Sequence, residues 1–294
     1  MLATLVTSAV FAFDNVHPIE HITQGGYANQ YFSHLEDGSS SLTIESMLEN
    51  TYEDLFSPGA EEVLNQGYST SAFWLHGRFR AGDNAPHSTR FFAIEYSLLD
   101  NVEFYVVKQG KVITQWLTGD ARPFDTRPID HTWFLFPVEF AAGDTLDIYI
   151  RVESTSSLRL PISIWEPSVF YDLQRPRLLT EGVYFGIVFL MFFYNLCLLA
   201  TVRDVSYFYY ITYILSLATF QLCMTGYGFE YIWPDHPRIN EFMLPFSVSA
   251  VGLFIVAFGM RVMDLQRNSQ LMYCLCCILM VLEAASALVS LVLP

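Results

Sequence analysis

The feature that most restricts the fold of this chain is a series of long uncharged segments in its C-terminal part. Residues 182–202, 205–229 and 242–260 contain no Asp, Glu, Lys or Arg, and residues 268–294 contain only Glu283. Each segment is about as long as the ~20 residues that a helix needs to cross a bilayer. The sequence therefore predicts four transmembrane helices. The predicted spans are residues 180–202, 205–226, 242–262 and 269–293.

The N-terminal part of the chain is polar and acidic instead. Residues 14–177 contain 23 acidic and 11 basic side chains, whereas residues 178–294 contain only 7 and 4. The first twelve residues are apolar and end in Val10-Phe11-Ala12, which suits cleavage by signal peptidase after Ala12, although a positive n-region is missing. A buried N-terminal strand is the alternative. We therefore expect three parts: a signal peptide over 1–12, a polar domain over 13–177 and a membrane region over 178–294.

The same features predict an orientation in the membrane. A cleaved signal peptide places the polar domain outside the cytoplasmic membrane. The loop over 261–267 then faces the cytoplasm with Arg261 and Arg267 against Asp264, as the positive-inside rule requires. Arg175 and Arg177 stand on the outer side and count against this assignment.

Composition and motifs argue against several functions. The net charge is −15 and only two lysines are present, so the chain lacks the basic clusters that nucleic-acid binding needs. All five cysteines lie in the apolar part, and the seven histidines show no metal-ligand spacing. We find no motif of a hydrolase, metalloprotease or nucleotide-binding protein. The sequence therefore predicts a protein that is not an enzyme and that uses no cofactor or metal.

Residues 40–167 show the two-residue alternation of β-strands, interrupted by Gly, Pro, Asp and Asn. Many short strands of this kind predict an all-β sandwich or jelly roll. The apolar sets expected to face its core are Phe73, Leu75 and Phe79; Phe92, Ile94 and Tyr96; Val102, Phe104 and Val106; Phe134, Phe136 and Val138; and Ile148, Ile150 and Val152.

The order of several short motifs resembles a known family. These motifs are Ser71-x-Phe73-Trp74-Leu75, Glu95-Tyr96-x-x-Leu99-Asp100, Arg122-Pro123-Phe124-x-x-Arg127-Pro128, Leu158-x-Leu160-Pro161-x-x-x-Trp165, Tyr194-Asn195-Leu196, Arg203-Asp204-x-Ser206-Tyr207 and Tyr231-x-Trp233-Pro234. Together they are similar to the bacterial seven-transmembrane receptors with diverse intracellular signalling modules, in the class whose periplasmic domain is a jelly roll similar to carbohydrate-binding modules. The resemblance implies a periplasmic sensor whose helices relay a signal to a cytoplasmic output module.

This chain departs from the family pattern because it has four of the seven expected spans and no output module. We therefore expect a C-terminally truncated product, whose partners are the lipid bilayer, an unknown periplasmic ligand, and either a signalling module in a full-length form or other chains. Two functions of other classes stay open. One is a membrane-anchored docking platform for a protein, and the other is a transporter component, which the absence of paired broken spans argues against.

Four side chains of the polar domain are candidate ligand contacts. Carbohydrates and carboxylated small molecules need an aromatic surface and forked hydrogen-bond donors. Trp74 and Arg78 share the face of a strand that points away from the core, and Arg127 and His131 follow in an arginine-containing segment that resembles the family's. The alternative is that these residues are solvated, or that the arginines pair with neighbouring acids.

Two polar residues lie within the predicted spans. Asn195 is deep in the first span and Glu283 is near the middle of the fourth. A carboxylate at the centre of a bilayer costs about 2.5–3.5 kcal/mol or more, so it normally faces the interior of a helix bundle or is protonated. We expect these residues to relay a signal or a proton, or to bond to a neighbouring helix.

Overall fold

The protein consists of two compact units. The computed structural model describes residues 15–22, 25–49, 52–59 and 63–292. The first unit ends at Leu173 and the second begins at Gln174. The expected signal peptide over residues 1–12 lies outside the described residues.

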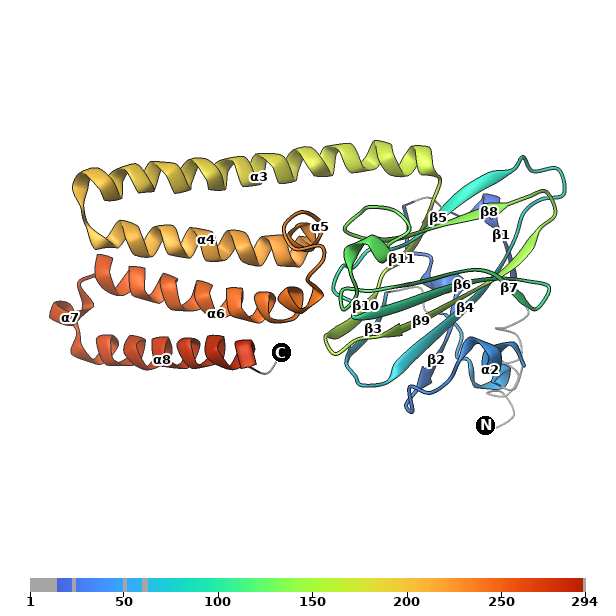
Figure 1. The fold of residues 1–294 in the computed structure, drawn as a ribbon, viewed down its shortest axis with the longest axis horizontal. Helices are drawn as coiled ribbons and strands as arrows, with labels where there is room; N and C mark the ends of the chain where they lie inside the picture. Colours follow the sequence, from blue (N-terminus) through green and yellow to red (C-terminus); the bar gives the residue numbers. More distant parts are fainter. Residues whose placement is uncertain (1–14, 23–24, 50–51, 60–62, 293–294) are drawn as a thin grey trace. The chain divides into compact units, whose positions relative to one another are not determined.

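The first unit is built from β-strands arranged in three sheets (Figure 1). The six-stranded sheet has the order β1-β4-β9-β6-β7, with β2 also paired to β4, the three-stranded sheet has the order β11-β5-β8, and β10 pairs with β3. The strands are β1 (Val16–Pro18), β2 (Ser33–Asp37), β3 (Leu64–Tyr68), β4 (Ala72–Arg80), β5 (Ser88–Ile94), β6 (Asn101–Lys108), β7 (Lys111–Thr118), β8 (Phe134–Phe140), β9 (Thr145–Glu153), β10 (Ser157–Leu160) and β11 (Ile162–Trp165). Short 3₁₀ turns occupy Ile19–His21, Asn29–Tyr31, Glu53–Leu55 and Phe124–Thr126.

The main core lies between the six-stranded and the three-stranded sheet. It contains all five apolar sets that strand alternation predicts, from Phe73 in β4 to Val152 in β9, with Tyr96 partly buried at its margin. Phe104 of β6 stacks on Phe136 of β8 at a centroid distance of 4.2 Å, which joins the two sheets directly. The predicted all-β sandwich is therefore confirmed.

Both sheets are also covered on parts of their outer faces. On the six-stranded sheet, the short helix α2 (Ile44–Leu48) buries Ile44 and Met47 against Trp74, together with Phe56. On the three-stranded sheet, Phe170 packs against side chains of the outer face, among them Trp165. Two smaller apolar clusters on the outer faces thus accompany the main core. Polar side chains remain accessible only where these clusters do not cover the sheets.

Helices make up the second unit, as the fold prediction for this part of the chain expects. They are α3 (Pro167–Val202), whose first turns belong to the first unit, α4 (Val205–Thr225), α5 (Tyr227–Tyr231), α6 (Pro237–Val262), α7 (Leu265–Asn268) and α8 (Gln270–Val292). Helix α6 packs against α4 and against α8 (Figure 1). Within the residues that the structure describes, four helices are long and apolar enough to cross a membrane. They are α3, α4, α6 and α8.

Local sequence signals explain where these helices begin and end. The Asp204 carboxylate accepts a hydrogen bond from the Ser206 amide at 2.8 Å and thereby caps the start of α4. Gly226 ends α4 with a φ of 82°, a conformation that costs little only for glycine. Pro237 occupies the first turn of α6, where its missing N–H would be unpaired anyway. The turns between the spans are thus encoded locally.

Candidate functional site

The outer face of the six-stranded sheet carries a band of polar and charged side chains. The strand register places Trp74, Arg151 and Glu103 side by side across β4, β9 and β6. Two residues further along the strands, His76 and Tyr149 are paired in the same way. All five side chains point away from the main core, because successive side chains of a strand alternate between its faces.

Arg151 is the centre of an ion-pair network in this band. Its guanidinium donates to Glu103 and to Glu153, both at 3.1 Å, and to the Ser40 carbonyl at 3.0 Å. Glu103 also accepts a hydrogen bond of 2.6 Å from the hydroxyl of Tyr105, and burial together with this bond raises the pKa of Tyr105. Arg151 is only 9% exposed, and its Nε has no hydrogen-bond partner among the residues that the structure describes.

A loop held by Asp37 forms one wall above this network. The Asp37 carboxylate accepts hydrogen bonds from the Ser39 amide, the Ser39 hydroxyl and the Leu42 amide, at 3.1, 2.6 and 2.9 Å. Burial by itself would raise the pKa of Asp37, but these hydrogen bonds outweigh burial and lower it. The Ser40 hydroxyl accepts a hydrogen bond of 3.0 Å from the Ala72 amide of β4. This bond attaches the loop to the first residue of that strand.

The loop and the sheet enclose a groove of about 390 Å³, which we call the Arg151 groove. Its lining residues are Ser40, Ser41, Leu42, Thr43, Ile44, Glu45, Glu103, Tyr105, Gln115 and Arg151. This volume lies in the range of sites that hold small molecules, about 300–1,000 Å³. Hydroxyl, amide, carboxylate and guanidinium groups converge in it, so it offers both hydrogen-bond donors and acceptors at close spacing.

A second charged network lies on the same face. The Asp147 carboxylate oxygen Oδ1 is 2.9 Å from His76 Nε2 and 2.6 Å from Arg78 Nε. Burial lowers the pKa of His76, because the loss of hydration outweighs the attraction of Asp147 for the proton. Burial alone would raise the pKa of Asp147, but the hydrogen bonds from His76 and Arg78 lower it. The charges of this network are thus satisfied within the protein.

Trp74 lies beneath other side chains of the domain. Trp74 does lie on the strand face opposite the core, as predicted, but it is fully buried. Helix α2 and Phe56 cover it, and Tyr105 stacks beside it at a centroid distance of 6.2 Å. Because no ring face is open to solvent, Trp74 packs beneath the groove residues Ile44 and Tyr105 and does not offer a surface to a ligand. Arg78 shares its face and is held by Asp147.

Arg127 and His131 lie elsewhere, at the three-stranded sheet. Arg127 is 5% exposed and donates to the carbonyls of His131 and Thr132, at 2.8 and 2.7 Å. The His131 ring contacts Phe170 at a centroid distance of 5.3 Å. The structure therefore does not bring the four predicted ligand contacts together. Their ligand-binding roles stay predictions, and burial argues against such a role for Trp74 and Arg127.

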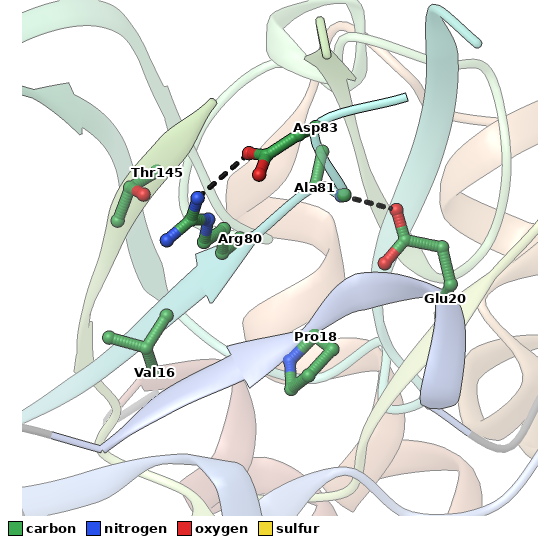
Figure 2. A pocket seen from close by; sticks show the side chains of 8 residues that line it. Val16, Pro18, Glu20, Arg80, Ala81, Asp83 and Thr145 are labelled. Carbon is green, nitrogen blue, oxygen red and sulfur yellow. Dashed lines mark hydrogen bonds and ion pairs between the residues drawn. The ribbon is translucent and has the colours of Figure 1, made fainter. Parts of the chain in front are cut away.

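A second hollow, of about 410 Å³, lies at the end of β4 (Figure 2). Arg80 donates to Asp83 at 2.8 Å, and Glu20 accepts from the Gly82 amide at 2.8 Å. Arg80 and Asp83 are 52% and 74% exposed, so their charges are well hydrated and their pairing contributes little. This hollow is therefore a weaker candidate site than the Arg151 groove.

The two polar residues expected within the spans occupy different helix interfaces. Asn195 is buried and donates to the Met191 carbonyl at 2.8 Å, beside a cavity of about 450 Å³ that α3, α4 and α6 line. Glu283 lies against α6: a β-carbon at Gly252 would be 2.8 Å from the carboxyl carbon of Glu283. Glu283 thus faces a neighbouring helix. A relay function of either residue stays a prediction.

Both parts of the chain match models of known protein families. Residues 29–166 match the family model described as 7TMR-DISM extracellular 2, and residues 177–294 match the model described as 7TM diverse intracellular signalling. The chain belongs to the seven-transmembrane receptors with diverse intracellular signalling modules. No curated protein matches it. The resemblance expected from the short motifs is confirmed, and the chain is a multi-pass membrane protein of a receptor family.

The Arg151 groove lies entirely within the part of the receptor that matches the extracellular model. Sequence reasoning missed it, although one signal was available. Arg151 and Glu103 stand at outward positions of strands whose inward positions are strictly apolar. An arginine at such a position, in register with an acid on the next strand, marks a place where charge is concentrated on a sheet.

Proposed function

We propose that this receptor is a sensor whose extracellular domain binds a small polar molecule in the Arg151 groove and whose helices relay occupancy to a cytoplasmic output module. The observation that carries the proposal is Arg151 itself. Its nearly buried guanidinium stands at the side of a groove lined by hydroxyl, amide and carboxylate groups, where it holds Glu103 in place by an ion pair. Such a convergence of polar groups in a groove of this volume is typical of sites that orient a small ligand by hydrogen bonds.

The charge of the groove favours a neutral, hydroxylated ligand of the carbohydrate type. Glu45 and Glu103 line the groove together with the single cation Arg151, which already binds Glu103 and Glu153. A carboxylated ligand would therefore meet an excess of negative charge. Hydroxyl groups, in contrast, can donate to the carboxylates and accept from the guanidinium.

We further propose that the receptor resides in a bacterial inner membrane, with a cleaved signal peptide and the sensor domain in the periplasm, and that it acts without catalysis. A sensor binds and releases its ligand unchanged, so binding alone must bias the conformation of the helices. Membership in a receptor family and the segregation of polar groove and apolar spans into separate units support this reading.

Ligand binding can be tested with the full chain in detergent or nanodiscs. A panel of neutral saccharides and of uronic acids is screened by thermal shift, since a ligand of the native state raises its stability by mass action. We expect a neutral saccharide to stabilise the protein. The affinity for it should fall at least about 10-fold in Gln115→Ala and in Glu45→Ala, which is about 1.4 kcal/mol for one lost hydrogen-bonding group.

Asp83→Asn is the matched control, because Asp83 lines a different hollow of the same domain. The affinity of Asp83→Asn for the stabilising saccharide should equal that of the unmodified receptor. Loss of binding in Asp83→Asn with normal binding in Gln115→Ala would move the site to the hollow at Arg80. A preference for uronic acids would contradict the charge argument.

A docking platform for another protein is the second candidate function. The observation that favours it is the edge strand β7, whose Ile113 and Leu117 are 53% and 40% exposed. An edge strand with exposed apolar side chains is a typical place for strand addition. If no saccharide binds, and Ile113→Lys abolishes capture of a partner by the full chain, this function replaces ligand sensing.

A further inference from the structure

The outer face of the three-stranded sheet holds the first turns of α3. Phe170 is 1% exposed and inserts into a cluster of aromatic rings. Its centroid lies 5.8 Å from that of Phe91, 5.9 Å from Trp165, 6.1 Å from Trp133 and 5.3 Å from His131. We call these five side chains the α3 anchor. Aromatic pairs in such edge-to-face geometry contribute about 0.5–1.5 kcal/mol each beyond burial of their area.

An ion pair attaches the same end of the helix to the same sheet. Glu166, directly before α3, lies 3.2 Å from Arg90 of β5. The Glu166 carbonyl accepts from the Phe170 amide at 2.9 Å, so the ion pair and the aromatic ring are one helical turn apart. Arg90 is only 15% exposed at its side chain, which strengthens the pairing relative to a fully hydrated one.

Arg127 shapes the loop that supplies two of the anchor's rings. Its guanidinium donates to the carbonyls of His131 and Thr132 and lies 4.2 Å from the ring centroid of Phe134. Phe134 belongs to the main core between the sheets. Arg127 therefore connects the main core to the 127–133 loop, and the loop reaches Phe170 through His131 and Trp133. A buried guanidinium tolerates few other arrangements, because each lost partner leaves a desolvated charge.

The helix that begins in the anchor continues as one of the membrane spans. Helix α3 extends from Pro167 to Val202, and its apolar part is long enough to cross a bilayer. Helix backbone, and not a loop, therefore joins the first turn of α3 to its apolar part. Pro176 removes one backbone hydrogen bond and gives α3 a defined place to bend.

We propose that the α3 anchor is the element through which the state of the sensor domain sets the position of the first span, with Arg127 as its positioning residue. The inference rests on the proposed function only in naming the signal that the anchor carries. It gives the predicted candidates Arg127 and His131 a role in transmission. A movement of the 127–133 loop displaces His131 and Trp133 and thereby shifts Phe170, because these two rings form part of its pocket beside Phe91 and Trp165.

The test uses the full chain in nanodiscs and needs no ligand. Amide hydrogen exchange is measured for peptides covering residues 127–134 and 167–173. Arg127→Ala should raise the exchange rate of both segments at least about 10-fold, since the loop and the helix start open together. Arg127→Lys, which keeps the charge but lacks the planar guanidinium that lies over the rings of Phe124 and Phe134, should raise both rates to a smaller degree. Arg122→Ala, which removes a nearby arginine bonded to Asn101, is the control and should change neither segment.

Transmission into the span is read separately with Cys197 of α3. All other cysteines are replaced, which leaves Cys197 as the single thiol of the chain. Its rate of reaction with a membrane-permeant maleimide should change at least about threefold in Arg127→Ala and in Phe170→Ala, and stay unchanged in Arg122→Ala. An exchange rate that rises in 127–134 alone, or a labelling rate unaffected by both anchor variants, would overturn the proposal. Failure of saccharide binding would not, because neither measurement involves the Arg151 groove.

Discussion

At the scale of single residues, the buried pair of His76 and Asp147 makes the sensor domain sensitive to acid. His76 is 1% exposed, and burial lowers its pKa. The folded protein therefore binds a proton at this ring less readily than the unfolded chain does. The stability that this contributes is complete above the unfolded pKa of about 6.5 and is lost as the pH falls through that value towards the folded pKa.

We predict that the melting temperature of the full chain in detergent, followed by tryptophan fluorescence, decreases between pH 7 and pH 5. His76→Gln, which can still donate to Asp147, should flatten part of this dependence. His17 and His34 also have pKa values lowered by burial, so a residual slope is expected. His87→Gln is the control, because its side chain is 64% exposed and pairs only loosely with Glu139. Equal slopes for His76→Gln and the unmodified chain would contradict the assignment.

At the scale of secondary-structure elements, strand alternation predicted the main core but not the outer faces. Phe73, Leu75 and Phe79 read correctly as inward residues because alternation is a local property of β4. The burial of Trp74 depends on α2 and Phe56, which reach it from other parts of the chain and leave no periodic mark on β4. The Arg151 groove escaped prediction for the same reason, since its wall is a loop fastened by Asp37.

The interface of α6 and α8 carries a prediction of its own. Glu283 of α8 lies against Gly252, and one turn away Ser249 donates to Ser286 at 3.1 Å. A β-carbon at Gly252 would approach the Glu283 carboxyl within 2.8 Å, so the side chain must leave its place. Because this carboxyl is the end of a flexible side chain, Gly252→Ala should cost less than the about 1–3 kcal/mol of overpacking a rigid core. It should loosen the interface slightly and thereby increase the rate of proteolysis of the chain in membranes.

The matched control for this variant is Gly259→Ala in the same helix, where an added β-carbon meets no atom within 4 Å. Gly259→Ala should be neutral or slightly stabilising, since alanine has the higher helix propensity. Combining Gly252→Ala with Glu283→Ala should restore resistance to protease, because the clashing carboxyl is gone. Equal behaviour of the two glycine variants would show that Glu283 is not seated on Gly252.

At the scale of the whole molecule, the polar candidate site and the long apolar helices belong to separate units. The polar side chains that form grooves and networks concentrate before Leu173, and the long apolar helices follow. Family membership was predictable from sequence because the order of several weak motifs is specific when taken together. The charges of the turns predict which side of the membrane each turn faces, and this prediction can be tested directly.

The orientation predicts a simple alternation along the membrane region. The turn at Arg203 and Asp204 and the turn around α7, with Arg261 and Arg267, should be cytoplasmic, and the segment around Asp235 should be periplasmic. Alkaline phosphatase needs disulfide bonds that form only outside the cytoplasm. Fusions of this enzyme after Asp235 should therefore be active, and fusions after Asp204 inactive. The opposite pattern would place the sensor domain in the cytoplasm, where the signal-like segment ending at Ala12 would have no purpose and the proposed receptor could not meet an external ligand.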